Sequence, residues 1–133
     1  MRIFTACLLL AAAMLFADPA RAQEEVTSIV IGETYPGIVA PFCTTAEEAQ
    51  RLAHIFENGG IEAGSFYIED SGTCLALGPD SPLGEFRTRR LVEKDVPVKG
   101  LPEKISIVEI VLTDDVGHEY SLFILTSFPV SER

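Results

Sequence analysis

The pattern of apolar and polar residues divides the chain into one helical stretch and several strand-like runs. Between residues 44 and 60, apolar side chains recur at the i, i+3, i+4 and i+7 spacing of one helix face. They are Ala49, Leu52, Ala53 and Phe56. Thr44 or Thr45 can cap this stretch, with a glutamate three residues later in either register, and Asn58-Gly59-Gly60 tolerates the backbone of a helix C-terminus. The pattern predicts an amphipathic helix of about 13 or 14 residues.

The remaining segments have the composition and spacing of β-strands. The expected strands are residues 26–31, 65–69, 74–77, 85–93, 105–113 and 119–128. The run Asp70-Ser71-Gly72-Thr73 is typical of a turn, so residues 65–77 are expected to form a hairpin. Residues 105–128 are expected to form a long antiparallel hairpin around Gly117. Charges and Pro97 near residues 85–93 indicate an exposed edge strand.

These elements predict an α+β fold, with one N-terminal helix packed on an antiparallel sheet of about five strands. Residues 105–113 and 119–128 are apolar on nearly both faces. They are therefore expected in the centre of the sheet, which is either covered by the helix on one side or curled into a half-barrel.

The first 22 residues have the three parts of a secretory signal peptide. Met1-Arg2 is a short charged region, residues 3–17 are mostly apolar, and Ala20-Arg21-Ala22 is a typical cleavage site. We expect cleavage to leave residues 23–133 as a single small α+β domain, exported to the periplasm or secreted. The apolar run of about 15 residues is shorter than the roughly 20 that span a bilayer, so no membrane span is expected after cleavage.

Cys43 and Cys74 are the two cysteines outside this signal sequence. In an exported chain they are expected to form a disulfide, which would enclose the helix in a loop of about 30 residues. A redox pair is more often C-x-x-C, and a zinc site would need further ligands, for which the sequence offers only His54 and His118. We therefore expect a structural disulfide, and no metal or cofactor.

The formal net charge of −10 argues against nucleic acid or an anionic membrane as a partner, because both bind concentrated positive charge. The local exception is a basic cluster of Arg87, Arg89, Arg90 and Lys94, of which the three arginines are the candidate binding residues. On a regular strand Arg87 and Arg89 would share one face, with Arg90 on the other. The cluster is a candidate binding site for an acidic partner or a carboxylate, and the alternative is a solvated strand edge.

The run Asp70-Ser71-Gly72-Thr73 resembles the D-[ST]-G-[ST] signature of aspartic proteases. The resemblance covers four residues, and Glu69 stands where that family usually has an apolar residue. It implies that Asp70 would act in a dimer in which two such carboxylates share a proton and activate water. The same four residues are also typical of an ordinary turn with no catalytic role.

The sequence has no G-x-S-x-G elbow, glycine-rich phosphate loop or H-E-x-x-H helix. We therefore expect a non-catalytic binding or interaction module, such as an inhibitor or accessory subunit whose partner is another exported protein. The alternatives are a small hydrolase that uses Asp70 and a structural component of the cell envelope.

Overall fold

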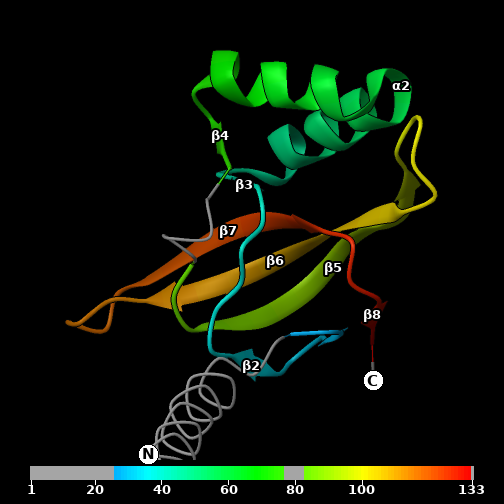
Figure 1. The fold of residues 1–133 in the computed structure, drawn as a ribbon. Helices are drawn as coiled ribbons and strands as arrows, with labels where there is room; N and C mark the ends of the chain where they lie inside the picture. Colours follow the sequence, from blue (N-terminus) through cyan, green and yellow to red (C-terminus); the bar gives the residue numbers. More distant parts are fainter. Residues whose placement is uncertain (1–25, 77–82, 133) are drawn as a thin grey trace, which may run out of the picture.

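The computed structural model describes residues 26–76 and 83–132. It has an α+β fold in which a bent helix lies on one face of a six-stranded antiparallel sheet (Figure 1). The strand order in this sheet is β2-β5-β6-β7-β3-β4. Its strands are β2 (Thr34–Tyr35), β3 (Phe42–Cys43), β4 (Cys74–Leu75), β5 (Phe86–Pro97), β6 (Lys104–Thr113) and β7 (Glu119–Thr126). A separate parallel pair, β1 (Ile29–Val30) and β8 (Val130–Ser131), lies on the face opposite the helix.

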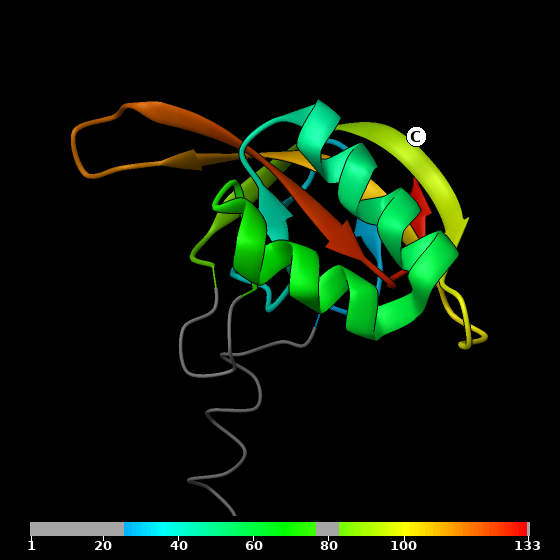
Figure 2. The ribbon, with the colours of Figure 1, turned by 90° about the horizontal axis from the view of Figure 1, so that it is seen from above.

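The predicted hairpin at the end of the chain is confirmed as β6 and β7. The two strands pair in continuous register from Ser106↔Thr126 to Thr113↔Glu119. Asp114 closes the turn, because its Oδ1 accepts hydrogen bonds from the backbone N–H groups of Val116 and His118. The hairpin runs out beyond the helix as an arm (Figure 2).

The helix α2 (Ala46–Ser71) begins where the sequence predicts but extends much further. Thr45 is its N-cap, and its hydroxyl oxygen accepts a hydrogen bond from the backbone N–H of Glu48 at 3.1 Å. Gly60 has a φ of 81° and interrupts the helix, which then continues at a new angle as the two arms seen in Figure 2. The predicted end of the first helical segment at Gly59-Gly60 is therefore correct, but a second helical segment follows it directly.

Residues 65–69 belong to this second segment, so the predicted strand and its hairpin with residues 74–77 are wrong. Phe66, Tyr67 and Ile68 favour a strand by their intrinsic propensity. Tertiary contacts decide otherwise, because Gly64 lies against the ring of Phe56 and the hydroxyl of Tyr67 donates a hydrogen bond to Glu48 at 2.6 Å.

The sheet has a hydrophobic core on each face. On the helix side, β6 and β7 contribute Ile107, Phe123 and Leu125, which pack against the apolar stripe of α2. On the other side, Val108, Ile110 and Ile124 pack against the segment that leads into the sheet and against β8. Both faces are thus covered, which explains why these two strands carry apolar residues on both faces.

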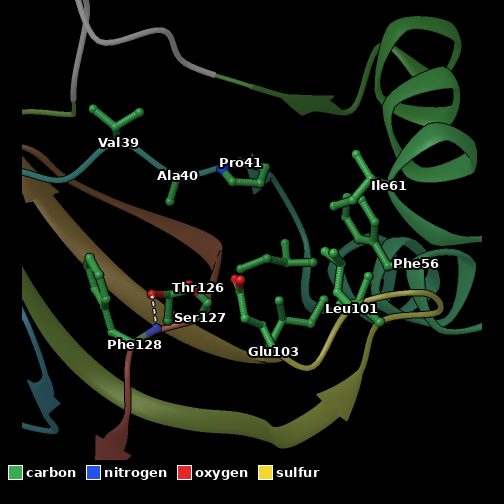
Figure 3. Close-up of a pocket in the computed structure, with 13 residues that line it drawn as sticks. Val39, Ala40, Pro41, Phe56, Ile61, Leu101, Glu103, Thr126, Ser127 and Phe128 are labelled. Carbon is green, nitrogen blue, oxygen red and sulfur yellow. Dashed lines mark hydrogen bonds between the residues drawn. The ribbon is translucent and has the colours of Figure 1, made fainter.

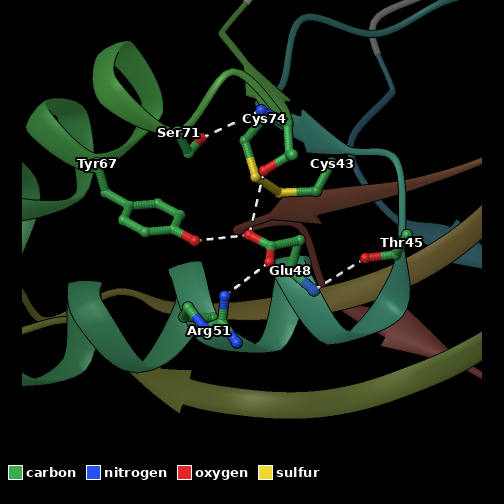
Figure 4. The surroundings of a disulfide bond; sticks show 8 residues. Cys43, Thr45, Glu48, Arg51, Tyr67, Ser71 and Cys74 are labelled. Atoms are coloured by element: carbon green, nitrogen blue, oxygen red, sulfur yellow. Dashed lines mark hydrogen bonds and ion pairs between the residues drawn. A yellow bond between two sulfur atoms is a disulfide. The ribbon is translucent and has the colours of Figure 1, made fainter.

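The predicted disulfide between Cys43 and Cys74 is confirmed. The two residues lie directly opposite each other in β3 and β4, with a Cα–Cα distance of 4.0 Å (Figure 4). The bond joins the strand before α2 to the strand after it, and so closes the loop that contains the whole helix.

Candidate functional site

A pocket of about 230 Å³ opens at one end of the sheet, beside the break in α2 (Figure 3). Its walls come from the segment before β3, from both arms of α2, from the β5–β6 loop with the start of β6, and from the end of β7 with the two residues after it. The lining residues are Val39, Ala40, Pro41, Phe56, Ile61, Val98, Leu101, Glu103, Ile105, Leu125, Thr126, Ser127 and Phe128. Most of them are apolar, so we call this site the apolar pocket.

Three large apolar side chains of the apolar pocket are exposed to solvent. Val39, Ile61 and Leu101 have 48%, 51% and 42% of their surface accessible. These three side chains surround one concavity, whereas exposed apolar residues are more often scattered singly over a surface. The arrangement is suited to binding an apolar group of about the size of one bulky side chain.

The helix break builds this pocket. Gly60 turns the chain so that Phe56 and Ile61, one on each side of it, both line the cavity. The β5–β6 loop fixes the break, because the backbone N–H of Lys99 donates a hydrogen bond to the carbonyl oxygen of Phe56 at 3.0 Å. A Cβ at Gly60 would lie 3.0 Å from the carbonyl oxygen of Lys99, so glycine allows this close approach.

Polar groups are few in the lining. Glu103 is the charged residue of the lining, and the close-up shows its carboxylate directed into the opening (Figure 3). The hydroxyl of Thr126 accepts a hydrogen bond from the backbone N–H of Phe128 at 3.1 Å. The lining is therefore mostly apolar, with a few polar groups at its edge.

The three arginines predicted as a binding site are brought to one face of the sheet, the face that also carries the helix. The register of β5 and β6 shifts between Thr88, which pairs with Ile110, and Arg90, which pairs with the next residue, Glu109. Arg89 is the extra residue of this bulge. The predicted separation of Arg89 and Arg90 onto opposite faces is therefore wrong, because a bulge breaks the two-residue period of a strand.

Arg89 and Arg90 both contact the carboxylate of Glu109, whose residue surface is only 6% exposed. Arg89 Nη1 lies 3.3 Å from Glu109 Oε2 and 3.4 Å from the hydroxyl of Ser121, while Arg90 Nε donates to Glu109 Oε1. Burial raises the pKa of Glu109, but the hydrogen bonds from Arg90 and Ser121 and the two positive charges together hold that pKa below its usual range. Arg87 lies apart, 3.6 Å from the exposed carboxylate of Glu119.

Asp70 does not lie at the end of a buried strand, where the aspartic protease signature would place it. It is an exposed residue in the last turn of α2. Ser71 and Gly72 end the helix, with Gly72 as the left-handed C-cap.

Both histidines lie on the surface beside acidic side chains. His54 lies 3.0 Å from Glu57 and 3.7 Å from Glu93. His118 lies 3.4 Å from Asp114. Among residues 26–76 and 83–132, no group of three or more histidine, cysteine or acidic side chains is arranged to hold a metal ion. In the same ranges, no helix is both long and apolar enough to cross a membrane.

A hydrogen-bond network around Glu48 supports the disulfide region (Figure 4). Its carboxylate accepts hydrogen bonds from Tyr67 at 2.6 Å and from Thr73 at 3.1 Å, and it lies 2.7 Å from Arg51. The hydrogen bond from Tyr67, followed by those from Thr73 and the charge of Arg51, lowers the pKa of Glu48 although partial burial opposes this. The network links the two arms of α2 to the turn before β4, which is a structural role.

The apolar pocket was not predicted from the sequence, since its walls come from five separate segments. The one local signal was Asn58-Gly59-Gly60, which marks the break at which Phe56 and Ile61 diverge. Comparison with protein-family models, with curated proteins and with solved structures gave no match for this chain.

Proposed function

We propose that this chain is a small exported binding module, an inhibitor or accessory subunit, which takes an apolar side chain of another exported protein into the apolar pocket. The observation that carries the proposal is the concavity with Val39, Ile61 and Leu101 exposed around it. An exposed apolar site of this kind is unfavourable in water and is typical of interaction surfaces.

The size of the pocket agrees with a protein partner. A volume of about 230 Å³ is below the roughly 300 to 1,000 Å³ of pockets that enclose whole drug-sized ligands. One buried anchor residue would fit, and burying a large apolar side chain contributes about 1.5 to 3 kcal/mol. Such anchors in central pockets commonly dominate binding free energies at protein interfaces.

The disulfide and the N-terminal pattern support export. A disulfide between Cys43 and Cys74 is typical of proteins in an oxidising compartment, and residues 1–22 resemble a signal peptide. The periplasm and the extracellular space both meet this condition.

The hydrolase alternative depends on the motif at Asp70 alone. Asp70 lies exposed in the last turn of α2, whereas the signature belongs at the end of a buried strand, so the binding function is better supported. A role as a structural envelope component would predict assembly into large complexes, which size-exclusion chromatography of the native protein would detect.

The test is recovery of a partner by affinity purification from the exporting compartment, using the oxidised chain of residues 23–133. The pocket variant Ile61→Asp/Leu101→Asp is expected to lose the partner, because two charges at the opening oppose burial of an apolar anchor. The control is Phe66→Asp, which places a charge at another exposed apolar residue of α2, 69% accessible and outside the pocket.

We expect the wild type and the Phe66→Asp control to recover the same partner at stoichiometric yield. Thermal unfolding of all three proteins checks that the pocket variant is folded. Recovery of that partner by the pocket variant would contradict the proposal, as would the failure of wild type to recover any protein at stoichiometric yield.

A further inference from the structure

We propose that Arg89 and Arg90 form a second binding site, separate from the apolar pocket, which takes the carboxylate of an aspartate or glutamate in an acidic segment of a partner protein. The site does not depend on the apolar pocket. It rests on how the bulge in β5 and the buried carboxylate of Glu109 hold the two guanidinium groups together.

The bulge gives two consecutive arginines the same neighbour. Without it, Arg89 and Arg90 would project from opposite faces of β5. With it, both reach Glu109, Arg89 through Nη1 and Arg90 through Nε. The guanidinium groups are therefore anchored side by side before any ligand binds, which reduces the entropy lost on binding.

The anchoring contacts leave donors available. Each guanidinium has five N–H groups. Within residues 26–76 and 83–132, Arg90 donates through Nε and Arg89 through Nη1, and the other nitrogens of the two guanidinium groups donate no hydrogen bond. About half of each arginine side chain is exposed, whereas Glu109 is buried beneath them. The free donors are thus accessible, and their planar groups suit a carboxylate.

The charge balance favours a single carboxylate over more highly charged ligands. Glu109 neutralises one of the two arginines, and Arg87 already has Glu119 at 3.6 Å. The site therefore has about one unit of excess positive charge. A phosphate dianion or a nucleic acid would in addition be repelled by the chain as a whole, whose net charge is −10.

The position on the sheet allows access. β5 pairs with β6 along its length, but β2 pairs only with its first residues, Phe86 and Arg87. In the described ranges no strand covers the outer edge of β5 beyond Thr88. An extended acidic segment can therefore approach the arginines from this edge.

Stability alone does not account for burying the carboxylate of Glu109 beneath two arginines. A buried carboxylate with its arginines is often no more stabilising than apolar residues of similar volume. Ionisable groups gathered in this way are more frequent at functional sites than elsewhere.

The test is a titration of the ¹⁵N-labelled oxidised chain, followed by NMR at low salt, with the blocked glutamate peptide acetyl-alanyl-glutamyl-alanine-amide, which carries a single carboxylate. We expect shifts localised at the amides of Arg89, Arg90, Glu109 and Ser121. Replacing one arginine, in Arg90→Gln, should weaken the association constant about tenfold, since it removes a charge-assisted pair. The control Lys94→Gln makes the same change of charge at an exposed residue of β5 and should change the constant less than about twofold.

Arg90→Lys is a second variant that keeps the charge but loses the planar fork, and an intermediate affinity is expected. The proposal is overturned by the absence of localised shifts, by equal losses in Arg90→Gln and Lys94→Gln, or by tighter binding of inorganic phosphate than of the glutamate peptide. The pocket variant Ile61→Asp/Leu101→Asp should bind the glutamate peptide within about twofold of wild type, because its substitutions lie outside the site. Failure of this site and failure of the apolar pocket are therefore distinguishable.

Discussion

Gly64 is the point at which the two arms of α2 meet most closely. A Cβ built at this position would lie 2.1 Å from Cε1 of Phe56, whose ring is buried in the core on the helix side. The glycine is needed for space, since its helical backbone would suit any residue. A residue of low helix propensity therefore lies in a helix because of a tertiary contact.

We predict that Gly64→Ala lowers the free energy of unfolding by about 1 to 2 kcal/mol. Overpacking of a core costs about 1 to 3 kcal/mol, and a Cβ only 2.1 Å from an atom of a buried ring belongs in the upper part of that range. The roughly 1 kcal/mol that alanine gains in a helix interior offsets only part of this cost. Urea unfolding followed by circular dichroism measures the difference. Gly84→Ala, where the new Cβ meets no atom within 4 Å, is the control and should differ little from wild type. A Gly64→Ala protein as stable as wild type would mean that the two arms are not packed in this way.

Arg89 shows how a single extra residue changes which face of a strand the following side chains occupy. Its insertion as a bulge moves Arg90 from one face of β5 to the other. Alternation along a sequence predicts faces only while the period of two is kept, and no residue type in Arg87-Thr88-Arg89-Arg90 signals a bulge.

At the scale of elements, the disulfide holds the bent helix to the sheet. Cys43 and Cys74 begin and end the excursion of the chain through α2, and both are fully buried. The strands that they join are only two residues long. Backbone pairing of β3 with β4 is therefore too limited to hold this end of the helix on its own.

We predict that the double variant Cys43→Ala/Cys74→Ala loses about 3 to 4 kcal/mol of stability, the chain-entropy value for a sequence separation of 31 residues. The melting temperature should fall by more than about 10 °C in calorimetry. A reducing agent should lower the melting temperature of wild type and leave that of the double variant unchanged. If reduction does not alter the melting curve of wild type, the disulfide does not stabilise the fold.

At the scale of the whole molecule, carboxylates in three separate places have lowered pKa values. They are Glu48 beside the disulfide, Glu109 under the arginines and Asp114 in the β6–β7 turn. For Asp114, burial raises the pKa, but the hydrogen bonds from His118, Tyr120 and Val116 outweigh it. Each group binds its proton less tightly in the folded than in the unfolded chain. Their contribution to stability is therefore complete above the unfolded pKa and is lost as the pH falls through the folded pKa.

We predict that the free energy of unfolding is constant near neutral pH and decreases as the pH falls below about 5. Glu109→Gln should be less stable than wild type at pH 7 by about 1 to 3 kcal/mol, because two arginines lose their common partner. This difference should shrink in acid, where wild-type Glu109 is itself protonated. Urea unfolding between pH 7 and pH 3 measures both curves, with Glu62→Gln on the exposed surface of α2 as the matched control. If the difference in the free energy of unfolding between Glu109→Gln and wild type stays constant with pH, the predicted link between stability and protonation of Glu109 is wrong.

The sequence by itself determined the elements whose signals are local or strongly periodic. These are the capped start of α2 at Thr45, its break at Gly60, the apolar hairpin of β6 and β7, and the pairing of Cys43 with Cys74. In the first three cases the physical cause lies within a few neighbouring residues. The cysteines could be paired because only two of them follow residue 22.

Only the tertiary structure decided the second arm of α2, the bulge at Arg89 and the apolar pocket. The second arm is a helix because Gly64 and Tyr67 meet Phe56 and Glu48, contacts that override the β propensity of its residues. The apolar pocket exists because segments distant in the sequence converge at the helix break. Such features depend on contacts between distant residues, which local pattern and composition do not encode.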